Sequence, residues 1–164
     1  MARDEHVYLV RHGRAEDHHV LGDEGRGLTE EGRQAFRHFV RQELGGLPLS
    51  AIATSPLVRA VQTAEILAEA CGVLQVLVVP ELAYSVASGP GILALCERLG
   101  PGFALVGHNP SLAAAVALCS AATPEQEIFR FRKGAIAALE PASSRGGALK
   151  AVWLASPGRK KRRF

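Results

Sequence analysis

Arginine and histidine side chains follow the predicted strands of this 164-residue chain in a pattern that suits phosphate chemistry. Arg11 and His12 come directly after an apolar run near the start of the chain, and His108 follows a later one. Arg59 lies in the first turn of a predicted helix, where the helix dipole disfavours a cation unless an anion lies beside it. The planar fork of arginine matches phosphate oxygens. These residues therefore predict a phosphate site.

The histidines indicate what such a site could do. A neutral imidazole is a competent nucleophile toward phosphorus. Neighbouring cations and helix N-termini are expected to lower the pKa of His12 and keep its ring neutral. Arg11, Arg59 and His108 would then stabilise the phosphoryl oxygens as charge spreads in the transition state. A carboxylic acid would be needed to protonate a poor leaving group.

A metal centre is the alternative interpretation of the same residues. His12, His108 and Glu81, which follows a third predicted strand, would form a plausible ligand set. The two arginines argue against it, because they would repel the cation. Sequence patterns typical of P-loops, nucleophile elbows, zinc proteases and dinucleotide-binding folds are absent from the chain. We therefore predict no metal site.

The elements that must position these side chains alternate between strand and helix. The pattern predicts strands at 6–10, 51–54, 76–79 and 103–106, helices at 29–44, 56–71, 91–99 and 110–120, and a hairpin from 135–139 and 149–154 around a Ser-Ser-Arg-Gly-Gly turn. Residues 15–28 are predicted to form a loop. Such alternation predicts an α/β three-layer sandwich: a mostly parallel central sheet, helices on both faces and an antiparallel edge strand. Ligands bind such sheets beyond the carboxyl ends of the strands.

Composition indicates one domain with a basic end. Hydrophobic residues make up 48% of the chain and charged residues 21%, which is typical of a globular domain and excludes a disordered chain. The net charge of +3 comes from the five consecutive cations at 159–163, and the rest is slightly acidic. We therefore expect a single domain over 1–157 and a solvated basic tail over 158–164. We expect no nucleic-acid partner except through this tail, which has no interleaved aromatic residues.

The cysteines, the length of the apolar runs and the charged start of the chain indicate where the protein is located. The odd number and wide spacing of Cys71, Cys96 and Cys119 predict reduced core residues. No apolar run reaches the roughly 20 residues that a membrane span requires. The charged start of the chain is unlike a signal peptide. The expected location is the cytoplasm, with no membrane partner.

Four short motifs, in this order along the chain, resemble those of the histidine phosphatase (phosphoglycerate mutase-like) superfamily. They are Arg11-His12-Gly13, Gly-Leu-Thr-Glu-Glu-Gly at 27–32, Ser-Pro-Leu-Val-Arg-Ala-Val-Gln-Thr-Ala at 55–64 and Gly-His-Asn-Pro at 107–110. Within the superfamily the likeness is greatest to the small SixA-type phosphohistidine phosphatases. Pro-Glu-Leu at 80–82 and Lys-Gly-Ala-Ile-Ala-Ala-Leu-Glu at 133–140 support this likeness.

The resemblance implies a role for each matched residue. His12 would be the phosphate-accepting nucleophile, and Arg11, Arg59 and His108 the other catalytic residues of the phosphate pocket. Glu81 would be the acid. The implied substrate-binding residues also include Gly13, Arg26 and Asn109. The implied reaction is phosphoryl transfer to His12 followed by hydrolysis, with no metal or organic cofactor.

The segments that could roof the site are short, which favours an open pocket. We therefore expect a phosphorylated protein as substrate, including phosphohistidine, or a small phosphate ester. Two alternatives remain: a phosphatase of small phosphorylated metabolites or nucleotides, and a non-catalytic anion-binding adaptor whose tail recruits nucleic acid.

Overall fold

A seven-stranded mixed sheet forms the centre of the molecule in the computed structural model, which describes residues 5–142 and 148–164. The strand order is β3-β2-β4-β1-β5-β6-β7. The strands are β1 (Val7–Arg11), β2 (Ala51–Thr54), β3 (Val76–Val78), β4 (Phe103–Gly107), β5 (Ile136–Pro141), β6 (Leu149–Ala155) and β7 (Arg162–Arg163). The first four are parallel and the last three antiparallel. This confirms the predicted fold class.

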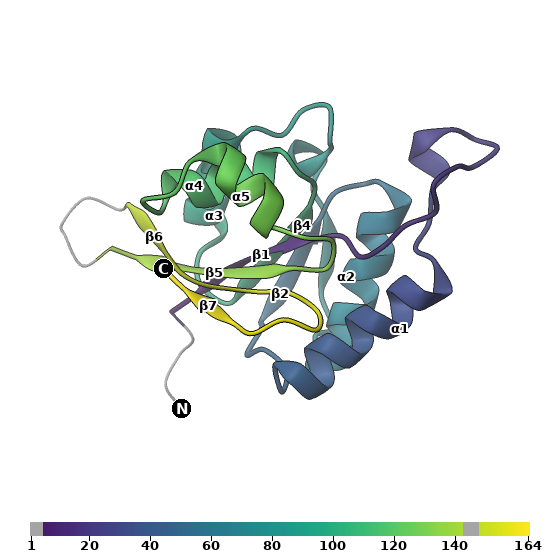
Figure 1. Cartoon of the computed structure of the whole chain (residues 1–164), viewed down its shortest axis with the longest axis horizontal. Helices are drawn as coiled ribbons and strands as arrows, with labels where there is room; N and C mark the ends of the chain where they lie inside the picture. The colour runs from purple at the N-terminus through teal and green to yellow at the C-terminus, as the bar shows by residue number, and fades with distance from the viewer. Residues whose placement is uncertain (1–4, 143–147) are drawn as a thin grey trace.

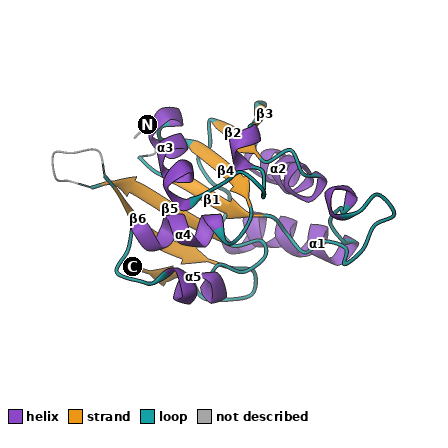
Figure 2. Cartoon of the chain, turned by 90° about the horizontal axis from the view of Figure 1, so that it is seen from above, coloured by secondary structure: helices purple, strands orange, loops and turns teal. Residues whose placement is uncertain are grey.

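Helices cover both faces of this sheet (Figures 1 and 2). α1 (Glu30–His38) and α2 (Val58–Cys71) lie on one face, and α3 (Gly89–Leu99), α4 (Ser111–Leu118) and α5 (Pro124–Arg130) on the other. Short helical segments are η1 (Asp23–Gly25), η2 (Phe39–Glu43), which continues α1, and η3 (Pro80–Leu82). Sequence reasoning missed α5, which begins with a capping box at Thr123.

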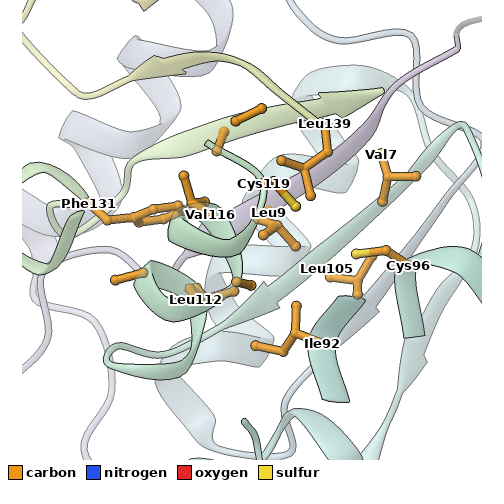
Figure 3. Packing of buried hydrophobic residues seen from close by; sticks show 14 of the residues in the cluster. Val7, Leu9, Ile92, Cys96, Leu105, Leu112, Val116, Cys119, Phe131 and Leu139 are labelled. Atoms are coloured by element: carbon orange, nitrogen blue, oxygen red, sulfur yellow. The ribbon is translucent and has the colours of Figure 1, made fainter. Parts of the chain in front are cut away.

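Each face of the sheet has its own hydrophobic core. Strand residues alternate between the two faces, so Leu9 packs under α3 and α4 whereas Tyr8 and Val10 pack against α1 and α2. Figure 3 shows the first of these cores, which includes Cys96 and Cys119. Both thiols are buried and reduced, as predicted, whereas Cys71 is half-buried. This packing fixes the sheet edge from which the polar residues project.

Two helices begin differently from the prediction. A Ser-Pro or Asn-Pro pair predicts a side-chain cap followed by proline in the first turn. Instead α2 begins at Val58, and Ser55 contacts His108. α4 begins at Ser111, and the side chain of Asn109 donates to the carbonyl of Phe131. Both helices therefore begin later than predicted. A tertiary partner takes the side chain of Asn109, whereas Ser55 accepts the N–H of Leu57 and also contacts His108.

The C-terminal segment is held by the sheet, contrary to the expected solvated tail. Arg162 and Arg163 form β7 against β6, and the backbone N–H of Phe164 donates to the carbonyl of Val152. The guanidinium of Arg162 also pairs with the buried Glu127. The expectation of a free tail is therefore wrong for these residues.

Two further points concern the described residues alone. The predicted hairpin turn at 143–147 lies outside them. Within them, no helix is long and apolar enough to cross a membrane.

Candidate active site

The loop after β1 is fixed on both sides at the carboxyl edge of the sheet. The backbone N–H of His12 donates to the carbonyl of Gly107 in β4, and the carbonyl of His12 accepts from the N–H of Gly134, just before β5. The N–H of Gly13 donates to the hydroxyl of Thr63 on α2. Three elements thus hold the position of His12.

A close approach of backbones explains the last glycine of the Gly-Leu-Thr-Glu-Glu-Gly motif. A Cβ atom at Gly32 would collide with the carbonyl oxygen of Arg14. That same oxygen accepts the N–H of Thr29, the cap of α1. The motif therefore ties the start of α1 to the loop that carries His12.

A polar cavity of about 290 Å³ opens at this edge. Its walls combine the ends of β1 and β4, the start of α2, the loop at 15–28 and the segment before β5. The lining residues are Arg11, His12, Asp23, Arg26, Arg59, Tyr84, His108, Asn109 and Lys133. The structure thus gathers most of the predicted site residues around one space.

The His12 ring is buried and oriented for attack. Its Nδ1 lies 2.7 Å from the carbonyl oxygen of Gly13, so Nδ1 carries the proton and Nε2 keeps its lone pair. Burial lowers the pKa of His12 from 6.5 to about 3, and His108, Arg59 and Arg11 add to this effect. The sequence predicted the direction of the pKa shift, but burial rather than neighbouring charge is its main cause.

His108 forms the opposite wall, with its ring centroid 5.2 Å from that of His12. Its Nε2 lies 2.7 Å from the hydroxyl of Ser55, which also accepts the N–H of Leu57. The hydroxyl can therefore donate to Nε2, which leaves a proton on Nδ1. That atom is buried and has no partner among the described residues. Burial, and to a smaller extent the charge of Arg59, lowers the pKa of His108 to about 4, so the ring is a neutral donor.

Arg59 is 3% exposed and reaches the cavity from the first turn of α2. It donates to the backbone carbonyl and the carboxylate of Asp23, at 2.9 and 3.1 Å. Arg26 holds the other carboxylate oxygen at 2.6 Å. These two arginines lower the pKa of Asp23 and keep it ionised. The Asp23 carboxylate thus occupies the side of the cavity where cations converge.

Arg11 and Asn109 share an anchor. Both side chains donate to the carbonyl of Phe131, at 2.9 and 3.0 Å. Nε of Arg11 and Nε of Arg59 are buried without a partner among the described residues. Unsatisfied buried donors are costly, so these two nitrogen atoms are a source of free energy that the fold must offset elsewhere.

Glu81 and Gly13 are not in the cavity lining. The Glu81 carboxylate lies on the surface and pairs with Arg98 at 3.0 Å. The structure therefore does not bring Glu81 to the histidines, either as an acid or as a metal ligand. No group of three potential metal ligands occurs in the described part of the chain. Gly13 instead acts behind the cavity, through the carbonyl that orients His12.

Three lining residues escaped sequence reasoning: Asp23, Tyr84 and Lys133. Asp23 had one local signal, its spacing of three residues from Arg26. Lys133 precedes an antiparallel strand, whose start lies at the same edge as the ends of the parallel strands. Burial and the neighbouring Arg11 lower the pKa of Lys133. The Tyr84 ring meets that of His108 edge-on at 6.1 Å.

Known proteins are similar to this chain in sequence and in fold. The model of the histidine phosphatase superfamily, branch 1, matches residues 7–83. The chain is 43% identical over 70 residues to "Probable phosphoglycerate mutase GpmB" of Cronobacter sakazakii, a match that covers 40% of this chain and 32% of the relative. The match thus spans about a third of that relative's length.

Solved structures show the same architecture over nearly the whole chain. A SixA protein from Agrobacterium tumefaciens superimposes with a TM-score of 0.74 and 22% identity, covering 95% of this chain and all of that one. The structure of protein histidine phosphatase SixA complexed with tungstate superimposes with a TM-score of 0.74 and 24% identity, and the match covers 93% of this chain and 97% of that one. A phosphoserine phosphatase from Entamoeba histolytica superimposes with a TM-score of 0.68 and 16% identity, and the match covers 93% of this chain and 98% of that one. The Arg-His-Gly, Ser-Pro and Gly-His-Asn-Pro segments meet at one edge of this fold, and the first two lie within the residues that match the histidine phosphatase model.

Proposed function

We propose that this chain is a phosphatase that works through a phosphohistidine on His12. The buried, neutral ring with a free Nε2 carries this proposal. Nε2 attacks the phosphorus atom, an N–P bond forms, and the bond to the leaving group breaks with its electron pair going to that group. Water then attacks the phosphohistidine, which releases inorganic phosphate and restores the neutral imidazole.

The surrounding donors support both steps. The guanidinium groups of Arg11 and Arg59 and the Nδ1–H of His108 provide fixed positive charge and hydrogen-bond donors beside His12. Such donors stabilise the equatorial oxygens as the phosphoryl group transfers. An entering phosphate must share Arg59 with Asp23 or displace the carboxylate, because that carboxylate already binds the guanidinium.

The finer proposal is a phosphohistidine on a protein. Asp23 is the only carboxylate among the described residues that line the cavity, and its lowered pKa keeps it ionised. A poor leaving group, such as a sugar alkoxide, would need a protonated acid there. Phosphohistidine needs no such acid, because its second ring nitrogen takes a proton from solvent and the ring leaves as neutral imidazole.

The proposal is tested by comparing wild type with His12→Ala and with His38→Ala, a control at an exposed position of α1. We expect His12→Ala to lower kcat for a chromogenic phosphate ester by a factor on the order of 10⁴ or more, because it removes the nucleophile. His38→Ala should retain wild-type kcat. Acid-labile phosphate should be trapped on wild type and not on His12→Ala. Turnover that survives in His12→Ala would overturn the nucleophile assignment.

Substrate class needs a second measurement. We expect kcat/KM for a phosphohistidine peptide to exceed that for the matching phosphoserine peptide by about 10²-fold or more, because the serine alkoxide leaves without an acid. Equal values would favour a general phosphatase of small esters.

A further inference from the structure

A second cavity, of about 340 Å³, lies beside the C-terminal strands. We call it the basic groove. Its lining residues are Phe129, Arg130, Arg132, Leu154, Ser156, Arg159, Lys160 and Arg162. Five of these eight side chains are cations and none is a carboxylate. The groove therefore concentrates positive charge in a chain whose other parts are slightly acidic.

Two of the five cations have an internal partner. Oε1 of Glu127, which is fully buried, accepts from Arg130 at 3.1 Å and from Arg162 at 2.9 Å. Arg132, Arg159 and Lys160 form no ion pair within residues 5–142 and 148–164. Like charges this close repel one another, so the groove favours an anionic occupant.

The topology places this groove at the same edge of the sheet as His12. Arg11 of β1 bonds to Ala135 just before β5, and Ile136 of β5 pairs with Ala155 at the end of β6. The turn between β6 and β7, which carries Arg159 and Lys160, therefore projects from the edge where β1 ends. Figure 1 shows this turn, in yellow, on the same side of the sheet as the ends of β1 and β4.

The distance between the two sites follows from the sheet. β1 and β6 are separated by two strand spacings, which amounts to about 10 Å. The segment before β5 connects the sites, because Arg132 lines the groove and Lys133 lines the catalytic cavity. An extended peptide rises about 3.3 Å per residue, so roughly three to five residues would reach from one site to the other.

We propose that the basic groove binds an acidic segment of the phosphorylated protein whose phosphoryl group enters the catalytic cavity. This inference rests on the proposed phosphatase function and names the substrate class more closely. Carboxylates suit the forked guanidinium groups of Arg132 and Arg159. Phe129, which is 79% exposed, offers an apolar contact to the same segment. A nucleic acid fits less well, because a single aromatic side chain lines the groove and successive bases require several.

The test uses two phosphohistidine peptides. One carries aspartates roughly three to five residues from the phosphohistidine on both sides, and the other carries asparagines there. The variant Arg159→Ala/Lys160→Ala removes two cations from the groove. The control Arg37→Ala/Arg41→Ala also removes two cations, both paired with Glu69 on the α1 side of the sheet. All three proteins are assayed with both peptides and with a chromogenic phosphate ester.

We expect the groove variant to raise KM for the aspartate peptide by about 5- to 20-fold, because it loses two ion pairs with the peptide at an accessible surface. Its kcat for that peptide should stay the same, and so should its KM for the asparagine peptide and for the ester. The control should match wild type throughout. Equal KM values for the two peptides in wild type, or an equal effect of the groove variant on both, would overturn the proposal.

A binding measurement separates this inference from the proposed function. The unphosphorylated aspartate peptide should bind wild type more tightly than the groove variant, even if no peptide is hydrolysed. Failure of the ester assay would then count against the phosphatase alone. Loss of binding to single-stranded RNA in the groove variant, with no change toward the aspartate peptide, would assign the groove to nucleic acid and overturn the inference.

Discussion

The catalytic cavity and the basic groove both gather arginines, but they hold them in different ways. Arg59 in the cavity is 3% exposed and bonded to Asp23, so its guanidinium has a fixed direction. Arg159 and Lys160 in the groove lie at the surface. A fixed, buried cation can stabilise charge as it develops in a transition state. An exposed cation attracts a partner, and salt screens that attraction.

The strands that carry the two regions explain this difference. His12 and His108, which directly follow the parallel strands β1 and β4, are 7% and 2% exposed. An antiparallel hairpin turns in solvent, and the turn after β6 exposes its side chains. The same sheet edge therefore offers one site suited to chemistry and one suited to recognition.

Removing one cation from each region should give the largest contrast. We expect Arg59→Ala to lower kcat for a chromogenic ester by about 10²- to 10³-fold, since it removes a buried donor to the transferring phosphoryl group. Arg159→Ala should change that kcat by less than about twofold, because screened surface charges contribute little. Steady-state kinetics at moderate salt measure both. Similar losses in the two variants would end the distinction between the regions.

The cavity should also make folding stability depend on pH. The folded state lowers the pKa of His12 from 6.5 to about 3, so at intermediate pH the unfolded chain binds a proton that the folded chain excludes. The stability that the neutral ring contributes is complete above about pH 6.5 and is lost as pH falls toward 3. Burial lowers the pKa of His108 to about 4, in the same sense.

Urea unfolding at pH 8 and pH 5 measures this effect. Between these values the free energy of unfolding should fall by about 2 kcal/mol more in wild type than in His12→Asn, which has no titrating ring. A neutralising variant in the groove should instead keep the wild-type pH dependence. An identical fall in wild type and His12→Asn would show that the His12 pKa is not lowered by folding.

The smallest effect is expected at Glu81. Its carboxylate is on the surface beside Arg98, outside the cavity. Glu81→Gln should therefore change kcat by less than about twofold for esters with good or poor leaving groups, since it removes only an exposed ion pair. A loss that grows as the leaving group becomes poorer would restore Glu81 as the acid.

Residues that follow parallel strands were predictable from the sequence. Arg11 ends one strand, and His12 and His108 directly follow strands, whose apolar runs are clear; α/β sheets place such ends together. Arg59 was predictable from the unfavourable position of a cation at a helix start. These local signals gave four of the residues that line the cavity.

The rest depends on contacts between distant parts of the chain. The start of β5 and the end of β6 reach the catalytic edge only because these strands are antiparallel, so Lys133 and the basic groove had no local signal. β7 has two residues, and it exists because β6 and Glu127 hold it. Glu81 was predicted to lie in the site because it follows a strand, but the short helix η3 places its side chain outside the cavity.

The three-sided attachment of His12 has a consequence for the energetics of turnover. Its main chain is bonded to Gly107 and Gly134, and its ring to the carbonyl of Gly13. The imidazole thus has little freedom left to lose when a substrate arrives. In the proposed mechanism, the entropic cost of reaching the transition state therefore falls on the incoming phosphorus and, in the second step, on the attacking water molecule.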